Sequence, residues 1–109
     1  MDNAQLLKGV LEGCVLAVID KGETYGYEII GELEKSGFDE IGEGTLYPVL
    51  TRLDKSGLIA CRRAKSPLGP VRKYYSITPQ GRSFLAEFKK RYRRITESAA
   101  AILFEEEIL

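Results

Sequence analysis

The chain has 109 residues, the length of a single domain. With 44% hydrophobic and 29% charged residues it can bury a core, which excludes an intrinsically disordered chain. It contains no histidine, the commonest general base and metal ligand, so we expect neither an enzyme nor a metal or cofactor site. The longest apolar run, residues 14–19, is far shorter than the ~20 residues that cross a bilayer, and no secretory signal opens the chain. We therefore expect a cytoplasmic protein without a membrane segment.

The formal net charge is zero, but the charges are segregated along the chain. Residues 1–43 carry three lysines and ten acidic residues, whereas residues 44–94 carry thirteen basic and two acidic residues, a net charge of +11. Residues 95–109 add four glutamates and no basic residue. Such blocks can be ordinary solvated faces. Positive charge concentrated in one part of a small domain favours a polyanionic partner.

Hydrophobic spacing predicts two helices in the acidic segment. Apolar residues recur every three or four positions over residues 5–20, and the second part of this helix is apolar on every side, so we expect one of its faces to meet another subunit. Thr24 is a suitable N-cap for a second helix that ends near Lys35. A short linker, extended around Phe38 and Ile41, is expected over residues 38–43.

A third helix is predicted to begin within residues 42–45 and to end at 56–57. Its inward face is formed by four aliphatic residues, Leu46, Val49, Leu50 and Leu53. The outer arc is small, hydroxylated or basic: Gly44, Thr45, Tyr47, Pro48, Thr51, Arg52 and Lys55. Slim, hydroxylated and arginine side chains suit contact with phosphates and base edges, so we interpret this segment as a recognition helix. The alternative is an amphipathic helix with a solvated face.

Residues 58–65 and 71–77 are predicted strands, joined by a Pro- and Gly-containing turn at 66–70. Five basic side chains flank this turn: Arg62, Arg63, Lys65, Arg72 and Lys73. Edge strands also carry lysines that prevent aggregation, which explains one or two of these charges. A wing lying along a phosphate backbone explains all five.

Two tyrosines, Tyr25 and Tyr27, open the second helix. A tyrosine hydroxyl at a helix N-terminus can reach a phosphate beside the free backbone N–H groups. We expect one of the pair to point outward and the other to join the core, and we assign the outward role to Tyr25.

The last helix is predicted to start at Thr78-Pro79 and to run to about Glu105. It carries apolar residues at alternating spacings of three and four: Leu85, Phe88, Tyr92, Ile95, Ala99 and Ile102. This stripe is typical of a coiled-coil seam and predicts a homodimer formed with the first helix. The alternative is that it packs onto its own domain. The basic run at residues 89–94 is either solvated or close to flanking DNA.

The element order predicts a mainly α fold with a β-hairpin, a winged helix-turn-helix with a long C-terminal dimerisation helix. Residues 1–78 would form the DNA-binding domain and residues 79–109 the dimerisation helix. A two-fold dimer would bind double-stranded DNA at a near-palindromic operator. The acidic first third and the acidic tail at 105–107 keep one alternative open, a non-catalytic protein-interaction module on a winged-helix scaffold.

Four segments in this order resemble the PadR family of bacterial transcriptional regulators, in its short branch with a single helix after the wing. They are Leu6-Leu7-Lys8-Gly9, Tyr25-Gly26-Tyr27-Glu28-Ile29, the run from Gly44 to Leu53, and the run from Arg72 to Arg82. The resemblance implies a dimeric repressor whose DNA contacts map to Tyr25, Thr45, Tyr47, Arg52, Lys65, Arg72 and Lys73.

The resemblance also implies a small aromatic or hydrophobic effector, because some family members release DNA when they bind phenolic acids or hydrophobic drugs. In one type, a tryptophan on the last helix stacks flat ligands in a pore between subunits. This chain has no tryptophan, so Phe88 or Tyr92 would line such a pore. The wing tip also departs from the usual Gly-Arg run, with Gly69-Pro70-Val71 before Arg72.

Overall fold

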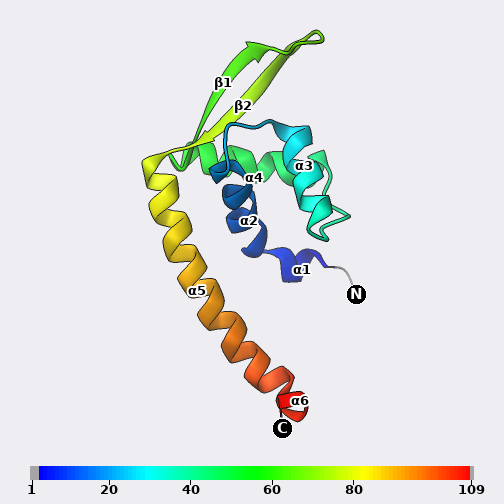
Figure 1. Ribbon diagram of the computed structural model, residues 1–109, viewed down its shortest axis with the longest axis vertical. Coiled ribbons are helices and arrows are strands. Elements are labelled where there is room, and N and C mark those ends of the chain that lie inside the picture. Colours follow the sequence, from blue (N-terminus) through cyan, green and yellow to red (C-terminus); the bar gives the residue numbers. More distant parts are fainter. Residues whose placement is uncertain (1–2, 109) are drawn as a thin grey trace.

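The computed structural model describes residues 3–108, and its elements follow the predicted winged-helix order (Figure 1). They are α1 (Ala4–Leu7), α2 (Val10–Asp20), α3 (Gly26–Lys35), α4 (Glu43–Lys55), β1 (Ile59–Lys65), β2 (Val71–Ile77), α5 (Pro79–Leu103) and α6 (Glu105–Ile108). The molecule measures 56 × 30 × 20 Å, because the hairpin projects from one end of the helical core and α5 runs out from it in the opposite direction. The predicted fold class is confirmed. No helix within residues 3–108 is long and apolar enough to cross a membrane.

Two local predictions are wrong. Thr24 is not the N-cap of α3, because that position is Tyr25 and the Thr24 hydroxyl donates to the Glu28 carboxylate at 2.6 Å instead. The single helix expected over residues 5–20 is broken at Gly9, whose φ of 88° lies in the left-handed region that glycine adopts without a Cβ clash. The apolar spacing hides this break because Leu7, in α1, also packs against the core. The linker over residues 38–43 turns at residues 39–40, between Phe38 and Ile41, and buries Ile41.

The core lies where α2, α3 and α4 meet. Its fully buried side chains are Val15, Leu16, Ile19, Ile29, Leu33, Leu46, Leu50 and Leu53. All four residues predicted for the inward face of α4 are buried, so the periodicity placed this helix correctly. Ile59 and Tyr75 from the hairpin and Leu85 from α5 complete the same cluster. The wing and α5 are therefore both anchored on the core that positions α4.

The hairpin is an antiparallel pair with a register that runs from Ile59 opposite Ile77 to Lys65 opposite Val71. Its root is also fastened to the loop before α3. There the backbone N–H of Thr24 donates to the carbonyl of Tyr75 at 3.1 Å, and the N–H of Tyr75 donates to the carbonyl of Thr24 at 2.8 Å. This bridge holds the base of the wing beside the N-terminus of α3.

The start of α5 is as predicted, with Thr78 as N-cap and Pro79 in the first turn. The Thr78 hydroxyl accepts from the N–H of Gly81 at 3.0 Å and donates to the carbonyl of Gly57 at 2.7 Å. Further along, Phe88 lies against Gly13 of α2, where a Cβ would overlap its ring. Beyond this contact the distal half of α5 extends away from the core (Figure 1).

Candidate nucleic-acid interface

The outward face of α4 is as the sequence predicts. All seven residues assigned to it are exposed: Gly44, Thr45, Tyr47, Pro48, Thr51, Arg52 and Lys55. They divide between two flanks of the helix. Tyr47 lines a hollow of about 510 Å³ together with Tyr25, Tyr27 and the wing. Thr45 and Arg52 line another, on the side of α1 and the start of α2.

Arg52 is not a free cation on that second flank. Its Nε lies 3.9 Å from the Glu12 carboxylate, although the Arg52 side chain is 60% exposed. An exposed pair at this distance contributes little to stability, so the guanidinium can exchange Glu12 for another anion. Tyr47 and Arg52, both predicted DNA contacts, therefore lie on opposite sides of one exposed helix face.

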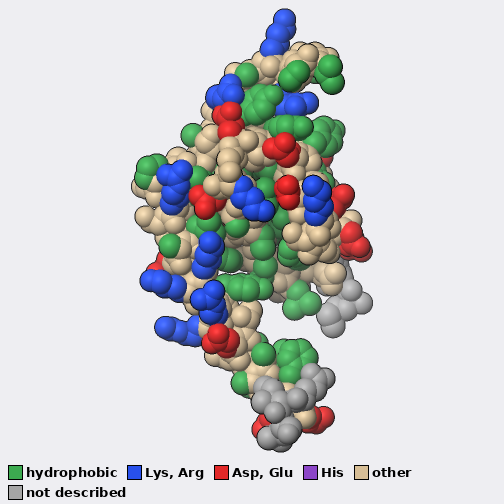
Figure 2. Space-filling model, in the orientation of Figure 1, with side chains coloured by type: hydrophobic (Ala, Val, Ile, Leu, Met, Phe, Trp, Pro, Cys, Tyr) green, Lys and Arg blue, Asp and Glu red, His purple; other side chains and the backbone are tan. Residues whose placement is uncertain are grey.

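Strand alternation separates the five wing cations into two groups. The register places Arg63, Lys65 and Lys73 on the hairpin face that carries Tyr75 at its root. All three are exposed, and within residues 3–108 none has an ion-pair partner. Figure 2 shows a basic side chain at the tip of the hairpin. This is the group that a phosphate backbone can meet directly.

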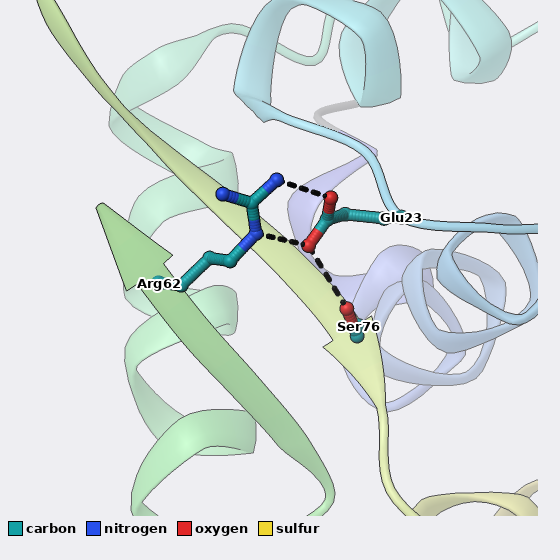
Figure 3. A network of polar contacts seen from close by, with 3 residues as sticks. All are labelled: Glu23, Arg62 and Ser76. Atoms are coloured by element: carbon teal, nitrogen blue, oxygen red, sulfur yellow. Dashed lines mark hydrogen bonds and ion pairs between the residues drawn. The ribbon is translucent and has the colours of Figure 1, made fainter. Parts of the chain in front are cut away.

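Arg62 and Arg72 belong to the opposite face of the hairpin. The Arg62 guanidinium donates two hydrogen bonds to Glu23, from Nε at 2.7 Å and from Nη2 at 2.6 Å, and Ser76 Oγ donates to the same carboxylate at 3.4 Å (Figure 3). The hydrogen bonds from Arg62 lower the pKa of Glu23, so the pair stays ionised at neutral pH. Of the five wing cations, Arg62 is therefore the one held by a carboxylate of its own chain within residues 3–108.

The two tyrosines at the start of α3, Tyr25 at its N-cap and Tyr27 in its first turn, are placed differently from the prediction. Tyr27, expected in the core if Tyr25 points outward, is 68% exposed. Tyr25 is half-buried: its ring meets Tyr74 edge-on at 5.9 Å, and the Arg72 guanidinium lies 3.9 Å above its centre. Tyr25 thus connects α3 to the wing, and Tyr27 presents the freer ring to the hollow beside α4.

Two exposed residues, Tyr27 and Arg63, belong to this candidate surface in the structure, although sequence reasoning did not include them among the predicted contacts. Arg63 shares the wing face of Lys65 and Lys73, and the period-two alternation of a strand was the signal that could have grouped it with them. For Tyr27 no signal existed, because the exposure of a residue in the first turn of a helix depends on what packs beside it. Within residues 3–108 no cluster of metal-ligating side chains is present.

The apolar stripe of α5 is divided into a part that is buried in the protein's own core and a part that is exposed. Leu85 is 4% exposed in the protein's own core and Phe88 is half-buried against α2. Exposure then rises along the helix, from 42% at Tyr92 to 66% at Ile95 and 78% at Ile102. The alternative of packing onto its own domain therefore holds for the first part of the stripe, and the remainder is open to solvent.

The basic run of α5 lies away from the wing. Lys89, Lys90, Arg91, Arg93 and Arg94 are exposed, and Figure 2 shows basic side chains along this part of the molecule. Of these five cations, only Arg91 has a carboxylate partner within residues 3–108, Glu87 at 3.4 Å. Position along α5 separates this run from the surface formed by α4 and the hairpin (Figure 1).

A three-helix core, a projecting hairpin and an exposed α4 face define a winged helix-turn-helix protein. Residues 15–87, more than half of the chain, match the model of the transcriptional regulator PadR-like family. The chain belongs to this family, whose members are DNA-binding regulators of transcription and not enzymes.

Individual relatives agree with this assignment. A PadR-like transcriptional regulator from Bacillus cereus is 45% identical, with a TM-score of 0.80 over 92% of this chain and 97% of that one. A Streptococcus transcriptional regulator is 42% identical, with a TM-score of 0.79 over 91% and 97% of the two chains. A transcriptional regulator of Mycobacterium tuberculosis is 35% identical over 81 residues, which cover 74% of this chain and 71% of that protein.

Proposed function

We propose that the protein is a homodimeric repressor that places α4 in the major groove of duplex DNA and lays its wing along the adjacent phosphates. The observation that carries this proposal is a group of three cations on one wing face, Arg63, Lys65 and Lys73, which have no ion-pair partner among the described residues and lie beside the exposed, hydroxylated face of α4. Tyr47 and Tyr27 lie between these two surfaces. The Tyr47 hydroxyl can donate to a phosphate oxygen there, whereas the Tyr27 hydroxyl is hydrogen-bonded to Glu43.

The test of this interface is the salt dependence of binding to a fluorescently labelled operator, selected from a random pool of duplexes. Lys73→Ala removes one phosphate contact, so the slope of log affinity against log salt falls by about one unit. The matched control is Lys35→Ala, which removes an exposed lysine from the far end of α3 and leaves the slope unchanged. A wild-type protein that ignores duplex DNA at low salt would overturn the proposal.

The dimer is proposed to form through the exposed part of the α5 stripe, at Tyr92, Ile95, Ala99 and Ile102. Beside it, α2 and α5 enclose a hollow of about 500 Å³ whose lining includes Ala17, Phe88 and Tyr92. Apolar side chains that lack a partner in their own chain are stabilised when a second copy covers them. Two such subunits would present their α4 helices to half-sites separated by about one or two turns of DNA.

Light scattering tests the dimer. Ile95→Glu combined with Ile102→Glu places two charges in the proposed interface and should give a folded monomer that binds the operator more weakly. Lys90→Glu, a charge reversal among the basic residues of α5, is the control and should remain dimeric. An unchanged dimer in the double variant would exclude this interface. Leu85 is unsuitable for the test because its loss would disrupt the core.

The repressor role and its release by an aromatic effector are also proposals. Three rings are stacked along α5, Phe84 on Phe88 at 6.5 Å and Phe88 on Tyr92 at 5.9 Å, and the latter two line the hollow beside α2. A flat aromatic ligand can stack on such rings. A phenolic acid should therefore release the wild-type protein from its operator and have little effect on Tyr92→Ala. Equal release of both proteins would exclude this site.

A further inference from the structure

Five side chains form a continuous series along one face of the hairpin, and two of them come from outside it. The Arg72 guanidinium lies 3.9 Å from the ring centre of Tyr25, whose ring meets Tyr74 at 5.9 Å. The Arg62 guanidinium lies 4.9 Å from the ring centre of Tyr74 and is bonded through two nitrogens to Glu23. The series therefore links the middle of the wing to the loop before α3 and to Tyr25, the N-cap of that helix.

Glu23 lies at the root of the hairpin, where its contacts can set the direction of the whole wing. Glu23 precedes Thr24, whose backbone is paired with Tyr75, so a side-chain contact and a backbone bridge hold the wing at the same point. Ser76 donates a third hydrogen bond to the Glu23 carboxylate from the neighbouring strand (Figure 3). Beyond this point the hairpin projects freely from the core (Figure 1), so a small rotation at its root moves the tip substantially.

We propose that Glu23 is a positioning residue for DNA binding: through Arg62 it holds the wing at the angle at which Arg63, Lys65 and Lys73 meet the phosphates. This inference rests on the proposed function and adds an acidic residue to its machinery. A binding surface that is already held in its bound geometry loses less conformational entropy when DNA binds. Arg62 then acts on DNA through the direction of the wing and makes no phosphate contact of its own.

Two simpler interpretations predict that Glu23→Gln changes the affinity for DNA in the opposite direction. If Glu23 only adds negative charge near the interface, its neutralisation strengthens DNA binding. If DNA phosphate displaces Glu23 from Arg62, neutralisation frees Arg62, which strengthens binding and steepens the salt dependence. The proposal instead predicts that Glu23→Gln weakens binding although it removes a charge that DNA repels.

The experiment measures the affinity of the full-length protein for the selected operator over a series of salt concentrations, by fluorescence anisotropy. Glu23→Gln and Arg62→Met should each weaken binding by about threefold to fivefold, the range that one exposed ion pair can supply, and the double variant no further. Arg62→Lys should resemble Arg62→Met, because a lysine keeps the charge but cannot form two parallel bonds. Glu34→Gln, which neutralises an exposed acid elsewhere on α3, is the matched control and should not weaken binding.

Two further measurements separate positioning from loss of structure. All variants should melt within a few degrees of the wild type, because both partners are substantially exposed. The NMR order parameters of wing amides should fall relative to those of α4 in Glu23→Gln, whereas the salt slope should stay at its wild-type value.

Three outcomes would overturn the inference. The first is that Glu23→Gln binds the operator more strongly than the wild type. The others are that Arg62→Lys binds with wild-type affinity, or that the salt slope of Arg62→Met falls by about one unit. The last two would make Arg62 a direct phosphate contact. These outcomes differ from failure of the proposed function itself, in which the wild type does not bind duplex DNA.

Discussion

Gly81 of α5 packs directly against the root of the hairpin, so Gly81→Ala tests the geometry on which both the wing and α5 depend. A Cβ at this position would lie 2.7 Å from Ile77 Cγ1 and would overlap the carbonyl oxygen of Leu58. The Leu58 carbonyl belongs to the backbone and cannot rotate away as a side chain can, so the first turn of α5 has to move. That movement stretches the hydrogen bond from the N–H of Thr78 to Leu58, which is 3.1 Å long, and the bond from the Thr78 hydroxyl to Gly57.

The expected decrease in the free energy of unfolding follows from these contacts. Overpacking costs about 1–3 kcal/mol, and weakening two hydrogen bonds costs about 1 kcal/mol each. The better helix propensity of alanine offsets about 1 kcal/mol. We therefore expect Gly81→Ala to lower the free energy of unfolding by about 2–4 kcal/mol.

The assay is urea unfolding followed by circular dichroism, at one fixed protein concentration because the stability of the proposed dimer would depend on concentration. The matched control is Gly31→Ala in α3, where a Cβ meets nothing within 4 Å and should stabilise the protein by about 0.5–1 kcal/mol. If Gly81→Ala unfolded at the same urea concentration as the wild type, the close packing of α5 on the hairpin root would be refuted.

Three further predictions concern the same core and its surface. Thr78→Ala should lower the free energy of unfolding by about 1–2 kcal/mol in urea, because the N-cap hydrogen bond is lost. Thr78→Ser keeps a hydroxyl and should retain most of this stability. Equal stability of the two variants would contradict the role of Thr78 as N-cap. Burial raises the pKa of Tyr75 to about 12, above the ordinary value of 10, so the folded state keeps a proton that the unfolded state loses. Tyr75 should therefore leave the free energy of unfolding unchanged below pH 10 and lower it between pH 10 and 12. In Tyr75→Phe this decrease should be smaller when unfolding is measured across the same pH range. Asp20→Asn should change stability by less than about 0.5 kcal/mol, because the 3.5 Å pair between Asp20 and Arg82 is exposed; a larger loss in thermal melts would contradict this.

Periodicity alone determined which faces of the helices are buried. The spacing of Leu46, Val49 and Leu53 places them on one side of a helix wherever that helix sits, and the structure buries all three. The N-cap at Thr78 was equally local, because the bond it forms closes within three residues. The order of the elements, and with it the winged-helix class, follows from such local signals.

Tertiary structure decided which charges are free and which apolar residues are covered. Arg62 and Arg63 are adjacent in sequence, yet one is paired with Glu23, 39 residues away, and the other faces solvent. Leu85 and Ile95 belong to one regular stripe, but only Leu85 lies where α5 crosses the core. Spacing along a chain specifies a face, whereas an ion pair or a buried contact also requires a partner at a distance that only the folded backbone sets.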